Sequence, residues 1–171
     1  MAQIAPEYEV RRIRAHEWRE LRDLRLTALV DTPIAFGELH AEAARLDDDA
    51  WRERARLGAA GDDRAMFVAI IDGRFVGMTG VFLEGHPAPT VIAVFVRPEA
   101  RGIGVAEALF GAVMAWAAAT SDADVIRLTV HEDNHHARRL YERLGFTLTG
   151  WTEPYVHDHS RLELEMTRPL R

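Results

Sequence analysis

Residues 94–106 have the residue types of an anion-binding site. They read Val-Phe-Val-Arg-Pro-Glu-Ala-Arg-Gly-Ile-Gly-Val-Ala, so an apolar run leads through a proline and two glycines into an alanine-rich stretch. The first turn of a helix has backbone N–H groups without intrahelical partners and carries the positive end of the helix dipole. Gly102 and Gly104 have no Cβ and let a phosphate approach the backbone, and Arg101 adds a bidentate cation. The segment therefore predicts a phosphate-binding loop.

Glycines at this spacing also occur in loops with different roles. A tight turn between a strand and a helix would need both glycines without any ligand. A Walker loop ends in Gly-Lys-Ser or Gly-Lys-Thr, and this chain contains no lysine. A dinucleotide-binding loop needs a third glycine, and Glu107 occupies that position. Neither of the two nucleotide-binding loops fits the sequence.

The same segment resembles the cofactor-binding motif of the GNAT acetyltransferase superfamily. Residues 101–106 match the pattern Arg/Gln-x-x-Gly-x-Gly/Ala, and residues 94–98 resemble the fourth strand of that family. The resemblance implies that the loop holds the pyrophosphate of acetyl-CoA, the co-substrate, through Arg101, Gly102, Ile103, Gly104, Val105 and Ala106. It also implies that the backbone of the preceding strand pairs with the pantetheine arm, at Val94, Phe95 and Val96.

A second motif lies downstream, in residues 134–146. It reads Asn-His-His-Ala-Arg-Arg-Leu-Tyr-Glu-Arg-Leu-Gly-Phe and is similar to the family pattern Asn-x-x-Ala-x-x-Leu-Tyr-Glu-x-x-Gly-Phe. The resemblance implies that Asn134 hydrogen-bonds the cofactor arm and that Tyr141 lies near the thioester sulfur. Its helical spacing alone would make Tyr141 a core residue, but two motifs in the family's order favour a role in catalysis. The resemblance covers residues 66–167.

Residues 131–135 spell His-Glu-Asp-Asn-His, the zinc-peptidase pattern His-Glu-x-x-His. In zinc peptidases both histidines lie on one face of a helix and bind the same metal. Here Asp133 or Asn134 is a natural helix N-cap. His131 and His135 would then not share a helical face, so we expect no metal site.

Direct attack of an amine on the thioester is the mechanism that the residue types favour. The chain has no cysteine and no Gly-x-Ser-x-Gly motif, which argues against an acyl-enzyme. Tyr141 is the predicted acid, and a backbone amide near Val96 is expected to polarise the carbonyl group. Glu84 is the first candidate for the base, directly or through a water, and His86 is the second. A solvated hairpin residue would account for Glu84 equally well.

The expected function is therefore the transfer of an acetyl group from acetyl-CoA to a primary amine, most simply that of a small molecule. The alternatives are a protein N-terminal or lysine acetyltransferase, acting on a peptide amine, and a non-catalytic acyl-CoA-binding domain. Residues 31–44 and 155–159 are the segments expected to flank the acceptor. His157 and His159 would bind or deprotonate the acceptor there, although a polar loop accounts for both residues equally well.

Hydrophobic periodicity predicts the elements that must position these residues. Strands are expected over residues 8–14, 66–71, 75–83, 90–96, 125–130, 146–151 and 162–167. Helices are expected over residues 16–30, 51–57, 105–119 and 135–143. This order predicts an α/β domain over residues 1–171, a GNAT acyl-CoA N-acyltransferase fold with a mixed, mostly antiparallel sheet and helices on both faces. The almost wholly apolar run 90–96 is expected to be a central strand buried on both faces.

Composition excludes several other classes of protein. The net charge of -6 and a pI near 5.7 argue against binding to nucleic acid. No apolar run approaches the length of a membrane span, and residues 1–8 do not resemble a signal peptide. Together with the lack of cysteine, these features predict a soluble cytoplasmic protein. The sequence leaves the oligomeric state open, including a homodimer.

Overall fold

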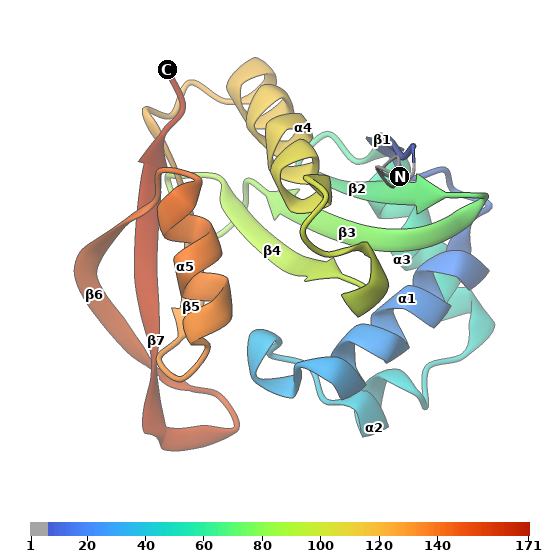
Figure 1. Cartoon of the computed structure of the whole chain (residues 1–171), viewed down its shortest axis with the longest axis horizontal. Helices are drawn as coiled ribbons and strands as arrows, with labels where there is room; N and C mark the ends of the chain where they lie inside the picture. Colours follow the sequence, from blue (N-terminus) through green and yellow to red (C-terminus); the bar gives the residue numbers. More distant parts are fainter. Residues whose placement is uncertain (1–6) are drawn as a thin grey trace, which may run out of the picture.

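The computed structural model describes residues 7–171 and contains a sheet of seven strands, in the order β1-β2-β3-β4-β5-β7-β6 (Figure 1). The strands are β1 (Glu9–Arg12), β2 (Arg64–Ile71), β3 (Arg74–Phe82), β4 (Thr90–Val96), β5 (Val125–His131), β6 (Thr147–Tyr155) and β7 (Asp158–Pro169). Neighbouring strands pair antiparallel except β4 and β5, which pair parallel. The prediction of a mixed, mostly antiparallel sheet is confirmed.

Helices cover both faces of this sheet. They are α1 (Trp18–Asp31), α2 (His40–Ala43), α3 (Asp48–Ala60), α4 (Val105–Thr120) and α5 (His135–Arg143), with the 3-10 turns η1 (Pro33–Ala35) and η2 (Pro98–Ala100). In β2, Phe67 packs in one core with Phe110 of α4, whereas its neighbour Val68 packs in the other core with Leu24 of α1. Successive side chains of a strand point to opposite faces, so α4 and α1 lie on opposite sides of the sheet. None of the helices within residues 7–171 is long and apolar enough to cross a bilayer.

Local sequence signals predicted most of these elements. The bounds of α5 agree with the prediction, and Asp47 caps α3, since its carboxylate accepts a hydrogen bond from the Ala50 amide at 2.9 Å. Asp72 and Gly73 join β2 to β3 with φ angles of 50° and 76°, as a tight hairpin turn requires. The short elements η1, α2 and η2 were not predicted, because four residues or fewer show no hydrophobic period. The strands β6 and β7 are longer than predicted, because β6 is exposed along eight of its nine residues and has no alternating apolar pattern.

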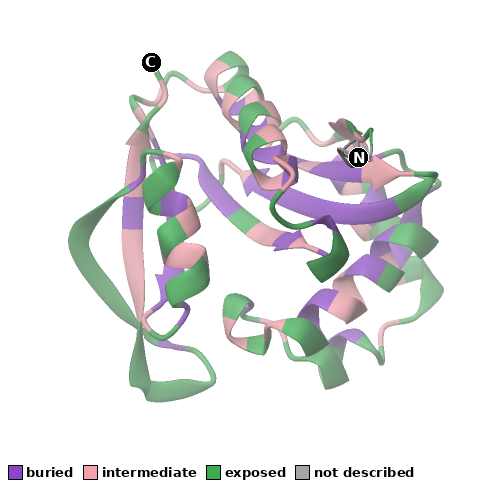
Figure 2. Ribbon diagram, in the orientation of Figure 1, coloured by how far each residue is buried: buried purple, intermediate pink, exposed green. Residues whose placement is uncertain are grey.

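The middle of β4 differs from the prediction and creates space for a site. Ile92 is 44% exposed there, and Figure 2 shows that the middle of β4 is not buried. Ala93 has a φ of 54°, and the register with β3 shifts at this point, which identifies a β-bulge. The pairing of β4 with β5 is confined to Thr90 and Arg127. Beyond Thr90 the two central strands therefore separate, and the expected burial of β4 on both faces is wrong.

Candidate active site

The predicted phosphate loop opens into a cavity of about 650 Å³ at the start of α4, called here the cofactor cavity. Its lining brings together every cofactor-binding residue predicted from the sequence except Ile103, namely Val94, Phe95, Val96, Arg101, Gly102, Gly104, Val105, Ala106 and Asn134. The two sequence motifs, which are about thirty residues apart, therefore face the same space.

The amides of the loop are available for a ligand. Among the described residues, no protein group accepts a hydrogen bond from the backbone N–H groups of residues 102–106, whereas the Arg101 amide donates to the Pro98 carbonyl oxygen at 3.3 Å. Gly102 and Gly104 have φ angles of 79° and 90°, in the left-handed region that favours glycine. A Cβ at Gly102 would contact nothing within 4 Å. This combination of free amides, a helix N-terminus and open space fits a phosphate group.

The side chain of Arg101 forms two hydrogen bonds within the protein. Its Nε donates to the Val96 carbonyl oxygen at 2.9 Å, and its Nη2 donates to Asp31 Oδ2 at 2.8 Å. Arg101 therefore ties the end of α1 to the end of β4. Its Nη1 donates to none of the described residues, so one edge of the guanidinium is left for an anion.

Asn134 is the helix N-cap that the sequence offered, and it lies between His131 and His135 as expected. Asn134 is buried and caps α5, with its Oδ1 accepting from the Ala137 amide at 3.3 Å, which leaves its Nδ2 group for the cavity. His131 is the last residue of β5 and His135 is the first residue of α5. The two histidines therefore do not share a helical face, and the zinc-peptidase geometry is not formed.

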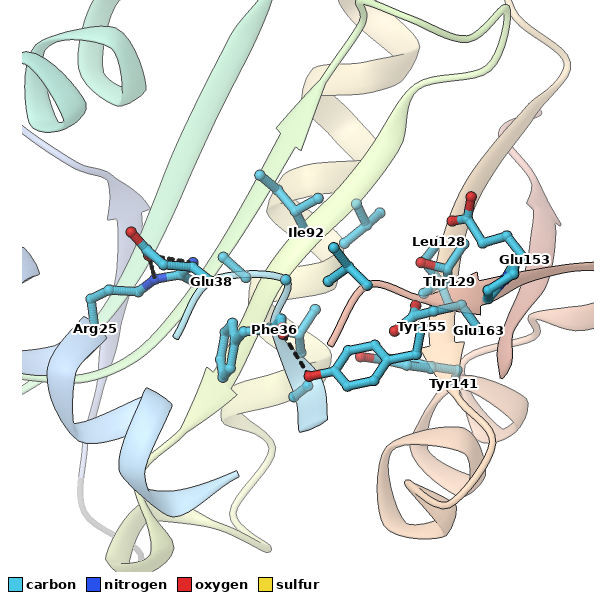
Figure 3. Close-up of a pocket in the computed structure, with 17 residues that line it drawn as sticks. Arg25, Phe36, Glu38, Ile92, Leu128, Thr129, Tyr141, Glu153, Tyr155 and Glu163 are labelled. Atoms are coloured by element: carbon cyan, nitrogen blue, oxygen red, sulfur yellow. Dashed lines mark hydrogen bonds and ion pairs between the residues drawn. The ribbon is translucent and has the colours of Figure 1, made fainter. Parts of the chain in front are cut away.

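A second cavity of about 500 Å³, the reaction cavity, meets the cofactor cavity at Ala35, Val94 and Tyr141, which line both. Figure 3 shows Tyr141, Tyr155 and Glu163 on one side of this cavity and Phe36 and Ile92 on the other. The separation of β4 from β5 forms this space. The structure thus places Tyr141 at the junction of the two cavities.

Tyr141 is held rigidly and keeps its proton. The residue is 7% exposed, and its ring packs against Phe110, with 5.8 Å between the ring centroids. Burial, together with the charge of Glu163, raises the pKa of the Tyr141 hydroxyl above its ordinary value. The hydroxyl donates to none of the described residues. Tyr141 is therefore a protonated donor facing the junction.

Glu163 of β7 is a candidate functional residue that the sequence did not reveal. It is half-buried in the lining of the reaction cavity, opposite His131 of β5 and Glu153 of β6 in the strand register. Burial raises the pKa of the Glu163 carboxyl, Glu153 adds to the rise, and Thr129 and His131 oppose it. A carboxylate whose pKa is raised toward neutrality has the properties of a general base.

Comparison with known proteins agrees with this geometry. The model of the acetyltransferase (GNAT) family matches residues 9–146. The chain belongs to this family. It is 34% identical over 86 residues to mycothiol acetyltransferase of Thermomonospora curvata, a match that covers 50% of this chain and 29% of that protein. It is 30% identical over 109 residues to an uncharacterized N-acetyltransferase of Mycobacterium bovis, covering 63% of this chain and 68% of that protein.

The fold of this GNAT chain is also found in solved structures. One is spermidine N-acetyltransferase from Vibrio cholerae in complex with CoA and spermine, with a TM-score of 0.74 and 17% identity. The similarity covers 95% of each chain. At this identity the likeness shows the fold alone.

The structure of this GNAT chain does not bring Glu84 or His86 together with Tyr141. Glu84 lies in the turn between β3 and β4 with 70% of its side chain exposed, and its Oε2 is 3.5 Å from Nη2 of Arg64. The His86 Nδ1 accepts a hydrogen bond from the Ala88 amide at 3.0 Å in the same turn. This turn precedes Thr90, whereas the reaction cavity opens beside the middle of β4. Of the two interpretations of Glu84, the solvated hairpin residue is the one that its environment favours.

The two segments expected to flank the acceptor meet across the reaction cavity of this GNAT chain. The Tyr155 hydroxyl donates to the Phe36 carbonyl oxygen at 3.2 Å, and Nε2 of His157 lies 2.9 Å from the Gly37 carbonyl oxygen (Figure 3 draws the first of these bonds). Glu38, next to Gly37, holds this segment in place through two ion pairs. Its Oε2 lies 3.0 Å from Nη2 of Arg25, and its Oε1 lies 2.6 Å from Nη2 of Arg54. We call the bonds of Tyr155 and His157 the latch.

Tyr155→Phe is expected to weaken this GNAT fold slightly, because the substitution removes the latch bond to the Phe36 carbonyl oxygen and leaves the ring in place. The free energy of unfolding should fall by about 1 kcal/mol, measured by urea denaturation. Tyr141→Phe is the matched control, since that hydroxyl donates to none of the described residues. Equal losses in the two variants would contradict the assignment of the latch.

Proposed function

We propose that the protein transfers the acetyl group of acetyl-CoA to the primary amine of a small molecule by direct attack of the amine on the thioester. The observation that supports this proposal best is the meeting of the two cavities at Tyr141. One cavity begins at free amides suited to a diphosphate, and the other holds carboxylates suited to an amine. A thioester at the junction would face both.

The separated edge of β4 suits the pantetheine arm. The Arg97 amide donates to the Val76 carbonyl oxygen of β3 at 2.7 Å. Amides alternate in direction along a strand, so the Val96 and Val94 amides point away from β3, toward the gap. The extended arm, with its own amide groups, would pair with this edge as a further strand does. Because Arg101 donates to the Val96 carbonyl oxygen, the pairing relies on the Val96 amide and the Val94 carbonyl oxygen.

Glu163 replaces Glu84 as the proposed base. Glu163 takes a proton from the ammonium or amine nitrogen, directly or through a water, and that nitrogen forms a bond to the acetyl carbon. The Val94 amide, at the junction of the two cavities, supplies a donor for the negative charge that develops on the carbonyl oxygen. As the carbon–sulfur bond breaks, Tyr141 gives its proton to the departing sulfur and is reprotonated from solvent. Positioning of both reactants supplies much of the rate enhancement.

The latch and the cavity charges favour a small acceptor. A peptide substrate would need an open groove along the edge of β4, and the bonds of Tyr155 and His157 cross that route. Glu153 and Glu163 line the reaction cavity, and among the described residues neither carboxylate forms an ion pair. Unpaired carboxylates attract a cationic amine. The spermine in the complex of the Vibrio cholerae spermidine N-acetyltransferase is an amine of this charge.

The direct test is an assay that combines thiol release with mass spectrometry of the acceptor. Purified protein, acetyl-CoA and a panel of primary amines should give free CoA and an N-acetylated amine in equal amounts. Tight binding of acetyl-CoA without an acetylated product from any amine would instead support the non-catalytic alternative.

Gly102→Glu is expected to weaken acetyl-CoA binding by at least about tenfold, because a carboxylate beside the free amides repels the diphosphate. Gly104 is less suitable for this test, because a Cβ there would lie 3.2 Å from the Tyr8 hydroxyl and disturb the packing. The matched control is Gly102→Gln, which places an uncharged side chain of nearly the same size at the same left-handed backbone position and so separates the charge from the backbone strain. Calorimetric titration measures both affinities, and equal affinities would refute the assignment of the loop.

A further inference from the structure

A third cavity of about 790 Å³ forms a groove on the face of the sheet that α1 and α3 cover. Its floor crosses β2, β3 and β4 at Met66, Gly80 and Ile92, which stand opposite one another in the strand register. A Cβ at Gly80 would lie 3.1 Å from Cγ1 of Ile92 and 3.2 Å from Cε of Met66. The two apolar side chains therefore close over the glycine and form a continuous floor, and Leu21 and Leu57 add apolar walls.

The groove adjoins the reaction cavity. Ile92 and Ala93 line both spaces, and so do Arg25 and Glu38. Ala93 is the residue of the β4 bulge that precedes Val94, where the reaction cavity meets the cofactor cavity. Ile92, which is 44% exposed, therefore stands between the groove and the cavity expected to hold the amine of the acceptor.

The carboxylates along the groove are already paired with arginines. Glu38 binds both Arg25 and Arg54, and Glu84 binds Arg64. These five residues are the charged members of the lining among the described residues, so the groove has three arginines against two glutamates and offers no unpaired carboxylate to an occupant. The unpaired carboxylates lie in the reaction cavity instead. The acceptor therefore needs a charged group only at the end that enters the reaction cavity.

We propose that the acceptor is a primary amine attached to an uncharged apolar body, with the amine in the reaction cavity and the body on the floor of the groove. This inference rests on the proposed function and names its class of substrate. A polyamine would fit this site poorly. Its second ammonium group would lose its hydration in the groove, where the carboxylates already form ion pairs with arginines. A volume of about 790 Å³ accommodates a body of small-molecule size.

A series of linear amines tests this proposal. From propylamine to hexylamine, kcat/KM is expected to rise by about fourfold for each methylene group, which corresponds to the ~0.8 kcal/mol of a buried CH₂. The matched diamine, 1,6-diaminohexane, should be at least about tenfold poorer than hexylamine, because its second ammonium group loses its hydration in the groove. A flat series, or a preference for the diamine, would overturn the proposal while the acetyltransferase activity stands.

A variant of the groove wall tests the location. Leu57 lies half-buried on α3 and lines the groove but neither of the other two cavities. Leu57→Gln should lower kcat/KM for hexylamine about tenfold, the loss expected when one apolar wall becomes polar, and leave propylamine unchanged. Leu148→Gln is the matched control, because Leu148 is 43% exposed on β6 and lines none of the three cavities. Equal effects of the two substitutions on hexylamine would overturn the location.

Calorimetry separates this proposal from the proposed function. Hexylamine is expected to bind the CoA-saturated protein, and Leu57→Gln is expected to weaken that binding about tenfold. If these results hold but no amine is acetylated, the proposed function fails and the groove assignment stands. Absence of hexylamine binding, or a dimer that Leu57→Gln dissociates while the amine series stays flat, would overturn the assignment. The second of these results would assign the groove to another copy of the chain.

Discussion

Glu163→Gln is expected to lower kcat by about 10²- to 10⁴-fold, the usual contribution of a positioned general base. The substitution keeps the size and the hydrogen-bonding capacity of the side chain but removes its ability to accept a proton. Steady-state kinetics with saturating acetyl-CoA measures the effect. Glu84→Gln is the matched comparison, because Glu84 is the base that the sequence predicts. A large loss in Glu84→Gln with an unchanged Glu163→Gln would return the role to Glu84.

The pH dependence of this pair follows from the environment of Glu163. Burial raises the pKa of its carboxyl above the ordinary 4.5, and the groups facing it are His131, Glu153, Tyr141 and Tyr155. The kcat of the unchanged protein should therefore rise with pH as Glu163 loses its proton, with the midpoint above 4.5. Glu163→Gln should lack this limb of the profile. An identical limb in both proteins would assign it to another group.

The raised pKa of Glu163 also affects stability. The native state holds the proton of this carboxyl more tightly than the unfolded chain does, so the free energy of unfolding decreases as pH rises from the ordinary pKa through the raised one. Glu163→Gln removes that decrease and should be the more stable protein at neutral pH. Urea denaturation at acidic and neutral pH measures the difference. A variant that is both inactive and less stable would indicate that Glu163 serves the fold.

Tyr141→Phe is expected to lower kcat by about 10²-fold, the lower end of the effect of a general acid, with little change in the affinity for CoA. The buried ring stays packed against Phe110, and only the proton for the departing sulfur is lost. Since the raised pKa of Tyr141 keeps its hydroxyl protonated near neutral pH, this loss should not depend on pH there. Unchanged kcat with weakened CoA binding would make Tyr141 a binding residue.

The parts of the site that the sequence predicted are those encoded by contiguous residues. A glycine loop before a helix and an asparagine at a helix start each depend on local backbone geometry. For that reason Gly102 and Gly104 were predicted from the loop itself, whereas the role of Asn134 was implied by the family resemblance, and the structure places all three residues in the lining of one cavity. The bounds of α5 followed from the same kind of signal.

The parts that the sequence missed depend on which strands become neighbours. In residues 162–166, the alternation Leu-Glu-Leu-Glu-Met indicates that Glu163 faces solvent, and only the insertion of β7 between β5 and β6 turns that face toward Tyr141. The latch also depends on the tertiary fold, because Tyr155 and Phe36 lie far apart in the sequence and no local pattern indicates their contact. The opening of β4 is also non-local, since its apolar residues are those of a covered strand until β5 diverges beyond Thr90.

The free amides of residues 102–106 are the feature on which the proposed function depends most. Their resonances in an amide nitrogen–proton NMR spectrum can be followed while CoA is added, with pantetheine, which lacks the diphosphate, as the comparison. We expect the signals of Gly102 and Gly104 to shift strongly with CoA and only slightly with pantetheine. Binding of CoA that leaves both signals in place would contradict the assigned site, and the mechanism built on it would fail.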